Sequence, residues 1–448
     1  MDRPLEDLTD ALLTAATAAG AEAADALAVN GHAQIIDVRA GTLEQAERAE
    51  GTDIGLRVLI GRRQACVSAS DTSDATIAML AERAVAMARE APEDPHAGLA
   101  DPAQLAVDRD WSGLELFDPT TEPQPAELQE HARAAEAAAL RVAGVTQVQS
   151  ASAAWSDQRL HLAATNGFSG SYRRSDSSVS CVAISGEGTG MQRDYDADSR
   201  VFASDLRAPD DIGHSAGTRA VAQIGAKKPP TGRYPVLFDE RISGSLVGHL
   251  LAASNGAAIA RGSSWLLGRM GEAVLPDALS LIEDPRRPRA TGSRPFDAEG
   301  LPTTRRAIVE NGILTGWTLD LATGRKLGLP STANARRGTS APPSPGVGNI
   351  ALTQGAQSRE DLLCEMGTGL WVTSMIGATI NPNTGDYSRG AAGFWVENGE
   401  VAYPVNECTI AGSLPEMLLR MIPANDARPW LSRVVPSLLV EGMTLAGD

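Results

Sequence analysis

The chain has 448 residues, with 39 Lys and Arg against 56 Asp and Glu, which gives a formal net charge of −17 at pH 7. Hydrophobic residues make up 43% and charged residues 21%, a balance that excludes a disordered chain and is typical of globular proteins. Because a single core rarely grows beyond about 250–300 residues, we expect at least two domains. The acidic charge counts against direct binding to nucleic acid, which usually needs a basic face.

Four cysteines lie far apart in the sequence and form no Cys-x-x-Cys pair, so they indicate neither a zinc ribbon nor a disulfide framework. Isolated cysteines are typical of buried thiols in a reducing compartment. The first residues are acidic and lack the apolar run of a secretory signal. The sequence also has no run of about 18 apolar residues that would span a membrane. We therefore expect a cytoplasmic protein without membrane contact. The cysteines are Cys66, Cys181, Cys364 and Cys408.

The spacing of apolar residues predicts a helix at the start of the chain, with Leu5, Leu8 and Leu12 on one face. Short strands follow. A second helix is predicted to begin after Ser73, which is suited to cap a helix N-terminus, and to end before Pro92. The strands between the two helices are predicted at Ala26–Val29, Ala33–Val38, Ile54–Ile60 and Ala65–Ala69.

A proline-rich connection, residues 92–126, separates this pattern from what looks like a second copy of it. A helix is predicted over about Pro125–Val142 and another over about Pro209–Gly225, with strands between them and a hairpin turn at Asn166-Gly167. The recurrence is consistent with an internal duplication in which the order of helices and strands is repeated but the residues are not. The strands of the second set are predicted at Val145–Trp155, Arg159–Ala164, Phe168–Arg173 and Ser178–Ser185.

The clearest boundary is the run Lys227-Lys228-Pro229-Pro230-Thr231-Gly232, after which the chain changes character. We therefore predict an N-terminal domain of residues 1–226 and a C-terminal domain of residues 233–448. The second begins with a strand at Tyr234–Phe238 and a helix at about Ser243–Ala258.

The rest of the C-terminal domain is predicted to be mostly strand and turn. Glu-Asn-Gly occurs at 310–312 and again at 397–399, each time between alternating apolar runs, which is the signal of a two-residue hairpin turn. The predicted fold is α+β: a domain of helix-flanked antiparallel sheets followed by a β-rich C-terminal domain.

One short sequence, Gly213-His214-Ser215-Ala216-Gly217, matches the nucleophile elbow of serine hydrolases. That chemistry requires the serine on a tight turn from strand to helix, with an acid and then a histidine later in the chain. Here a helix is predicted to begin at Pro209, so Ser215 would lie inside it, and His249 is the only later histidine. We interpret the segment as a helix whose small residues pack against a sheet. A stand-alone hydrolase is the less favoured alternative.

Two further segments contain residue types that occur in catalytic or binding sites. Ser185–Gly190 alternates glycine but lacks the Lys and Ser/Thr of a phosphate-binding loop, so we interpret it as a strand end or a loop. His249 lies on a predicted helix, but the residue five positions before it is Gly244, which cannot bind a metal. The residue pattern alone therefore indicates no zinc site.

The stretch Asn381–Glu400 is the most distinctive part of the sequence. Small residues at 390–393 allow another backbone to approach closely. Asp386 and Arg389 are able to fix a peptide terminus or a loop. An Asp–Arg pair at the turn of a glycine-rich strand explains them equally well.

This stretch, with Tyr403-Pro404-Val405 and Thr409-Ile410-Ala411-Gly412, resembles the PmbA (TldE) branch of the TldD/PmbA family. That family is described both as metalloproteases and as modulators of DNA gyrase. The resemblance extends over almost the whole chain. It includes Thr231–Val236, Arg261–Ser264, Glu310-Asn311-Gly312 and Pro436–Glu441.

In the TldD-like subunit of the family, an HExxxH helix and a cysteine near the C-terminus bind zinc, and the glutamate acts as general acid and base. Here Gly244 matches the first histidine and Ser245 the glutamate, and only His249 is retained. The cysteine-bearing segment is shortened to Asn425–Val435, which has no cysteine, and Cys408 does not match the ligand position. The resemblance thus implies a chain with no catalytic residue and no cofactor of its own, with zinc in a TldD-like partner.

The resemblance further implies a cytosolic TldD–TldE assembly that cleaves extended or unfolded peptides. This chain would hold substrate by pairing a peptide with an exposed strand edge, for which Gly390–Phe394 is the candidate. A non-proteolytic regulatory protein of the gyrase-modulator type is the alternative, and a homodimer of the isolated chain stays open. The candidate substrate-binding residues are Asp386, Arg389, Gly390, Ala391 and Gly393.

Overall fold

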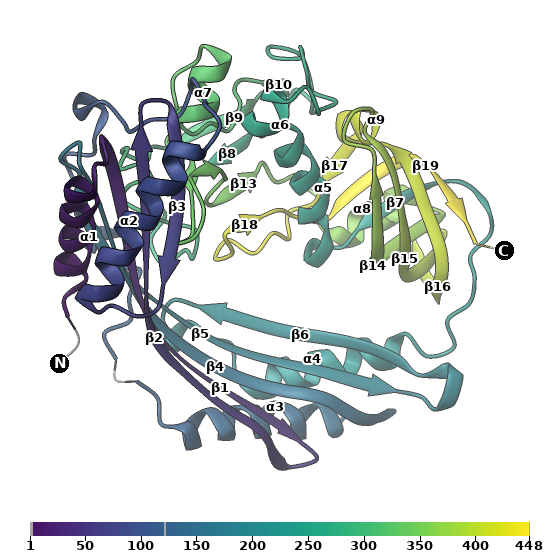
Figure 1. The fold of residues 1–448 in the computed structure, drawn as a ribbon. Helices are drawn as coiled ribbons and strands as arrows, with labels where there is room; N and C mark the ends of the chain where they lie inside the picture. The colour runs from purple at the N-terminus through teal and green to yellow at the C-terminus, as the bar shows by residue number, and fades with distance from the viewer. Residues whose placement is uncertain (1–2, 121, 448) are drawn as a thin grey trace.

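The computed structural model describes residues 3–120 and 122–447 (Figure 1). Its first half contains two units of the same order: helix, three strands, helix. The first unit comprises α1 (Leu5–Ala19), β1 (Ala23–Arg39), β2 (Thr42–Ile60), β3 (Arg63–Ala69) and α2 (Asp74–Glu90). The second comprises α3 (Pro125–Leu140), β4 (Val145–Ala164), β5 (Ser169–Ser185), β6 (Gln192–Arg200) and α4 (Pro209–Ala222). Short 3-10 turns lie at Pro102–Gln104, Ser112–Leu114, Gly188–Gly190 and Ala203–Asp205.

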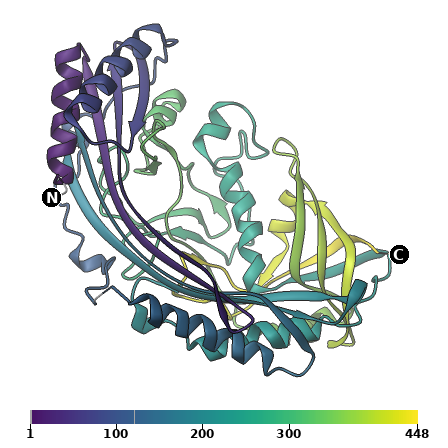
Figure 2. The same cartoon turned by 60° about the horizontal axis from the view of Figure 1, so that its bottom comes forward.

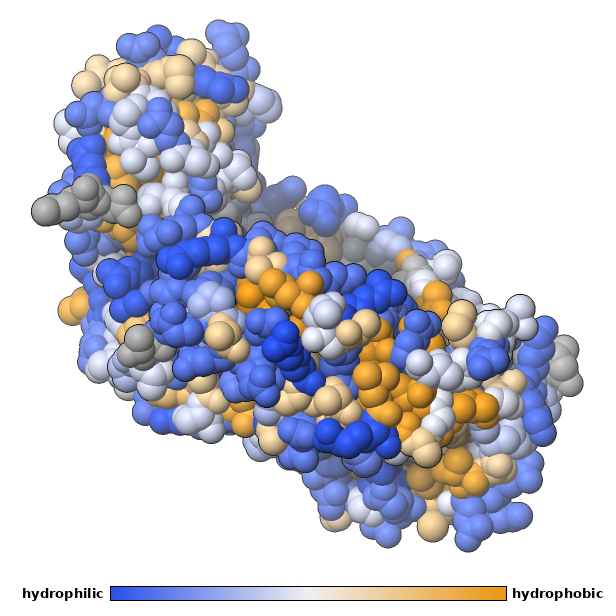
Figure 3. All heavy atoms as spheres, turned by 90° about the horizontal axis from the view of Figure 1, so that it is seen from below, coloured by the Kyte–Doolittle hydropathy of each residue, from blue (hydrophilic) through white to orange (hydrophobic). Residues whose placement is uncertain are grey.

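The two units share one continuous antiparallel sheet in the order β3-β2-β1-β4-β5-β6, which we call the large sheet. The recurrence predicted from the sequence is confirmed, but the expected separate sheets merge because β1 pairs with β4 along its length. Figure 2 shows the long strands curving around the C-terminal elements, with α3 and α4 on the outer side. Figure 3 shows that the face seen from below carries apolar patches separated by polar side chains.

Local signals set the ends of these elements. Ser73 caps α2 by accepting the backbone N–H of Thr76, and the helix ends at Glu90, before Pro92. A hairpin joins β4 to β5 at the predicted place, but Gly167 has positive φ (+93°) and Asn166 does not, so the loop is not the predicted two-residue turn. Several short predicted strands are parts of longer ones: Ala26–Val29 and Ala33–Val38 both belong to β1. β1 continues through the polar segment between them because β2 and β4 pair with it on both sides.

Two apolar clusters hold the helices on the large sheet. Leu8 and Leu12 of α1 pack with Ile54 and Leu56 of β2, and Ile212 of α4 lies in the second cluster with residues of α3 and β5. All five side chains are buried, and together the clusters cover the helix-bearing face of both units. Within residues 3–120 and 122–447, no helix is long and apolar enough to cross a membrane.

The second half is rich in strands. Its main sheet has the order β16-β15-β14-β7-β19-β17, and β16 also pairs with β19, so five of these strands close into a barrel. Its helices are α5 (Glu240–Ala253), α6 (Gly256–Ala260), α7 (Leu321–Leu327), α8 (Arg359–Met366) and α9 (Leu414–Leu419). Its strands are β7 (Gly232–Phe238), β8 (Leu281–Glu283), β9 (Arg306–Glu310), β10 (Ile313–Leu314), β11 (Ala335–Arg336), β12 (Ser344–Pro345), β13 (Ile350–Leu352), β14 (Gly369–Ile380), β15 (Asp386–Glu397), β16 (Glu400–Ser413), β17 (Met421–Pro423), β18 (Arg433–Val434) and β19 (Leu438–Ala446).

Both Glu-Asn-Gly sequences form the predicted hairpins. Asn311 and Gly312 have φ values of 47° and 80°, and Asn398 and Gly399 have 53° and 82°. Positive φ at two successive residues is the geometry of a type I′ turn, which asparagine and glycine tolerate best. The first turn joins β9 to β10 and the second joins β15 to β16.

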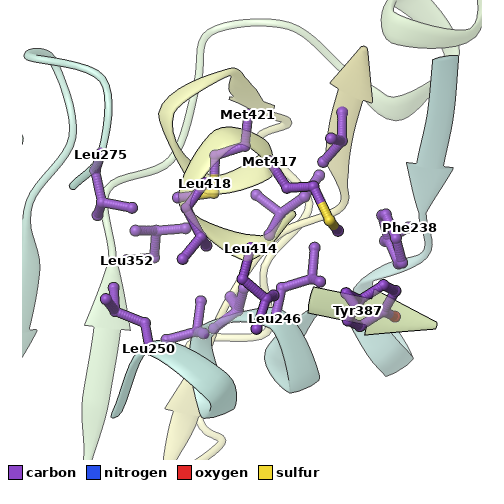
Figure 4. Close-up of a cluster of buried hydrophobic side chains, with 14 of the residues drawn as sticks. Phe238, Leu246, Leu250, Leu275, Leu352, Tyr387, Leu414, Met417, Leu418 and Met421 are labelled. Atoms are coloured by element: carbon purple, nitrogen blue, oxygen red, sulfur yellow. The ribbon is translucent and has the colours of Figure 1, made fainter. Parts of the chain in front are cut away.

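Helix α5 begins at the cap Asp239, whose side chain accepts the backbone N–H of Arg241. The single helix predicted for Ser243–Ala258 is two helices, because Asn255 caps a new one by accepting the N–H of Ala257. Figure 4 shows Leu246 and Leu250 of α5 in a cluster of buried apolar side chains.

A buried ion-pair cluster ties the large sheet to the second half. Asp25 of β1 accepts hydrogen bonds from Arg57 of β2 (Nε to Oδ2, 2.7 Å) and from Arg337, which follows β11. The side chains of all three are at most 4% exposed. The sheet therefore meets the residues after β11 through charges that have no access to water.

Candidate functional site

The helix α5 carries the three residues singled out from the sequence. Ser245 and His249 are one turn apart and share a face, and a Cβ at Gly244 would meet nothing within 4 Å. In the part of the chain that the structure describes, the buried Oγ of Ser245 and the buried Nε2 of His249 have no hydrogen-bond partner. This face of α5 thus carries polar atoms without hydrogen-bond partners. Beside it, at Gly244, there is room for a side chain.

His249 has an aromatic and a cationic neighbour, both from β15. Its ring centroid lies 5.8 Å from that of Tyr387, in an edge-to-face arrangement. Burial lowers the pKa of His249, and the nearby Arg389 guanidinium lowers it further. The imidazole is therefore neutral at pH 7, beside a positive charge that disfavours a metal cation.

Cys408 lies on β16, and its thiol donates to the carbonyl oxygen of Ala391 at 3.2 Å. Burial raises the pKa of Cys408 to about 11, so the thiol stays protonated, whereas zinc binds the thiolate. Among residues 3–120 and 122–447, no group of three or more His, Cys, Asp and Glu is placed to hold a metal ion. His249 therefore offers a single imidazole donor where zinc needs at least three protein ligands.

The glycine-rich strand β15 is one of the strands that form the wall of the barrel. It pairs with β14 on one side and with β16 on the other, so Gly390–Phe394 has no free edge for a peptide. The expected strand-edge pairing at this strand is wrong. The small residues serve close packing: a Cβ at Gly393 would lie 1.9 Å from the carbonyl oxygen of Trp371 on β14.

The five residues named for substrate binding differ in access. Ala391 and Gly393 are buried, and Gly390 is half-buried. Asp386 is exposed and accepts the Thr384 hydroxyl at 2.6 Å, while Arg389 donates from Nε to the carbonyl oxygen of Gly377 at 2.6 Å. Asp386 and Arg389 thus have separate local partners, and a role of these five residues in substrate binding stays a prediction.

The motif that resembled a nucleophile elbow lies within α4, and Ser215 is hydrogen-bonded to the carboxylate of Asp196 on β6. Gly213 packs directly on α3, where a Cβ would lie 1.9 Å from the carbonyl oxygen of Ala135. Small residues at this motif therefore bring α3 and α4 together, whereas the sequence suggested that they pack against a sheet.

We expect Ser215→Ala to leave the peptidase activity of a reconstituted assembly unchanged. Asp196 keeps Arg207 and Arg219 as partners, so the substitution removes one hydrogen bond, worth about 1 kcal/mol of unfolding free energy. Steady-state cleavage of an unfolded peptide and thermal unfolding of the chain measure the two effects. Lost activity with an unchanged melting temperature would restore the serine-hydrolase alternative.

Sequence reasoning missed a set of side chains that lines two hollows on the concave face of the large sheet. The volumes are about 680 Å³ and about 410 Å³. Arg174 of β5 lines both, and Arg294 and Arg336 line the smaller one. Arg174 and Arg336 are more than a hundred positions apart in the sequence, so no local sequence pattern links the three arginines.

The sequence matches three family profiles: PmbA/TldA metallopeptidase domain 1 over residues 24–88, the central domain over 118–224 and the C-terminal domain over 231–447. The metalloprotease PmbA of Escherichia coli O157:H7 is 36% identical over 415 residues, covering 92% of this chain and 90% of that protein. A PmbA homologue of Haemophilus influenzae is also 36% identical, covering 97% and 94%.

Solved structures agree. A protein from Bacteroides thetaiotaomicron, named as a candidate modulator of DNA gyrase, superposes with a TM-score of 0.91 at 26% identity, covering 99% of this chain and 98% of that one. TldE from Thermococcus kodakarensis has the same fold, with a TM-score of 0.86 at 20% identity, covering 98% and 99%. From the matching profiles and the relatives that align over nearly their full length, the chain belongs to the PmbA/TldD family, on its PmbA side.

Proposed function

We propose that this chain is the TldE-like subunit of a cytoplasmic two-subunit metallopeptidase that cleaves unfolded peptides, with zinc held by a TldD-like partner. The observation that carries the proposal is the α5 face, where within the described residues Ser245 Oγ and His249 Nε2 have no hydrogen-bond partner and Arg389 lies near His249. By the resemblance, Gly244 and Ser245 replace the histidine and glutamate of the family's zinc helix. The names of the relatives support the peptidase class.

The task of this chain in such an assembly is to hold substrate, not to activate water. The concave face of the large sheet provides hollows of about 680 and 410 Å³, within the range of ligand pockets in proteins. A chain lacking its own metal ligands has no means to lower the pKa of water by coordination. Peptide bound on this face would therefore be cut at the partner's zinc.

The isolated chain is expected to retain no stoichiometric zinc after loading and desalting, and to leave an unstructured peptide intact. Mixed with the HExxxH-bearing relative from the same genome, it is expected to co-elute and to give cleavage that a chelator abolishes. Elemental analysis and a peptide digest followed by mass spectrometry measure both results.

The matched control is a partner whose HExxxH glutamate is replaced by glutamine, which should assemble without cleaving. One tightly held zinc per isolated chain would contradict the proposal. Efficient cleavage by the partner alone, unaffected by this chain, would favour the non-proteolytic regulatory alternative suggested by relatives named as candidate gyrase modulators.

A further inference from the structure

The smaller hollow lies where the large sheet meets two segments of the second half, residues 292–298 and 335–339. Its volume is about 410 Å³. One wall is apolar and comes from both parts of the chain. Leu27 and Leu162 pack with Phe296, whose ring lies edge-to-face with that of Tyr172 at 5.5 Å. The wall is completed by Val29 and Leu160.

The other wall carries three arginines, of which Arg336 is the least engaged. Arg174 donates to the carbonyl oxygens of Thr291 and Ser293 at 3.1 Å each. Arg294 is buried, with its Nη2 3.5 Å from two carbonyl oxygens. Arg336 lines the hollow, and within the described residues its guanidinium donates no hydrogen bond and forms no ion pair.

Burial and a neighbouring guanidinium act on the charge of Arg336. Burial lowers its pKa to about 10 and Arg294 lowers it further, while Glu283 acts in the opposite direction, so Arg336 still carries its charge at pH 7. Its stem lies against Gly346, where a Cβ would come within 2.8 Å of the Arg336 Cδ. A guanidinium with unused donors favours a bidentate oxyanion.

The acids near the hollow already have partners. Glu283 accepts hydrogen bonds from Arg306, Asn334 and the backbone N–H of Gly348. Asp297 accepts three backbone N–H groups, and burial raises its pKa. Asp53 accepts the hydroxyl of Ser70 at 2.6 Å. None of the three is within ion-pair distance of Arg336 in the described structure, although Glu283 is near enough to favour its charged form, so the guanidinium keeps its N–H donors for a ligand.

We propose that this hollow binds the C-terminal residue of an unfolded peptide, with the terminal carboxylate on Arg336 and an apolar side chain against Leu27 and Phe296. A carboxylate accepts two parallel N–H bonds from a guanidinium, and the apolar wall takes the side chain out of water. The inference rests on the proposed function, because it assigns to that function the end of the substrate that this chain holds.

The larger hollow is positioned to bind the residues that precede the C-terminal residue of the peptide. It shares Val29, Asp53, Gln158 and Arg174 with the smaller one, so the two form one path along the concave face. A peptide anchored by its terminus at Arg336 would extend from the smaller hollow into the larger one.

Binding of two fluorescent hexapeptides to the full chain tests the assignment. Both have the sequence Ala-Ala-Ala-Ala-Ala-Leu with a dye on the N-terminus, and one ends in a free carboxylate while the other is an amide. The acid is expected to bind at least about tenfold more tightly than the amide. Arg336→Gln is expected to remove that difference, and Arg336→Lys to retain part of it, since lysine keeps the charge and loses the fork.

Arg83→Gln, the same change at an exposed site on α2, is the matched control and should keep the tenfold preference. Gly346→Ala displaces the Arg336 stem without altering its charge, and should weaken binding of the acid alone. Equal affinity of acid and amide for the unaltered chain overturns the proposal. So does inorganic phosphate that displaces the acid at the acid's own concentration, which would assign the site to a free anion.

The outcome separates this inference from the proposed function. A reconstituted assembly that cleaves acid and amide peptides equally well, with Arg336→Gln unaffected, keeps the function and removes the inference. A chain that prefers the acid through Arg336 but never supports cleavage keeps the binding site and removes the peptidase role.

Discussion

Asp25→Ala is expected to lower the free energy of unfolding by about 3–5 kcal/mol, because it leaves Arg57 and Arg337 buried without the carboxylate they share. Both guanidinium groups are almost fully shielded from water, so neither can be hydrated in place. Urea-induced unfolding followed by circular dichroism measures the loss. Glu44→Gln, which breaks the exposed pair of Arg39 and Glu44, is the control and should change stability by less than about 1 kcal/mol.

The same cluster predicts the direction of a pH effect. Burial would raise the pKa of Asp25, but Arg337 and Arg57 outweigh it and hold that pKa below its ordinary value. The stabilisation is therefore complete above the unfolded-state pKa of about 3.9 and is lost as pH falls through the lower folded-state pKa. The difference between the unaltered chain and Asp25→Ala should stay constant from about pH 5 to 8 and shrink below about pH 4. A difference that grew in acid would contradict the assignment.

Gly213→Ala is expected to destabilise the protein by about 1–3 kcal/mol, although alanine is the better helix former. The added Cβ would lie 1.9 Å from the carbonyl oxygen of Ala135, so α3 and α4 must move apart. Gly244→Ala on α5 is the matched control, since its Cβ meets nothing within 4 Å. It should stabilise by up to about 1 kcal/mol. Thermal unfolding of the two variants should thus shift in opposite directions, and a stabilised Gly213→Ala would show that the helices are not in contact there.

Elements whose limits are marked by local chemistry could be predicted from the sequence. Ser73 caps a helix, Asn311-Gly312 makes a turn and Pro92 follows a helix end, each for reasons contained in a few residues. The first half of β2 was not predicted, because its sequence is charged and does not alternate between apolar and polar residues. It forms a strand only through pairing with β1. β6 was missed for a related reason: its buried residues include Asp194 and Asp196, whose arginine partners lie on other elements.

The candidate site divides in the same way. The expectation that Gly244 and Ser245 replace zinc-motif residues could be drawn from one helix, since the family's motif is contiguous. The place of β15 within a closed barrel could not, because it depends on β16 reaching β19. The group of arginines around Arg336 could not be predicted from the sequence either. Its members come from β5, β11 and the loop before β9, and no regular sequence spacing relates them.

The large sheet has a consequence for how the chain folds. Contacts within each helix-strand-helix unit are short in sequence, whereas the pairing of β1 with β4 joins residues more than a hundred positions apart. Loop-closure entropy favours the short contacts first. Each unit can therefore form its hairpins on its own, whereas the pairing of β1 with β4 and the packing of α3 on Ile36 and Val38 of β1 need both units. We expect this joining to be the slow step. Until it occurs, β1 and β4 each expose an unpaired edge, and a chaperone that covers strand edges would act on this interval.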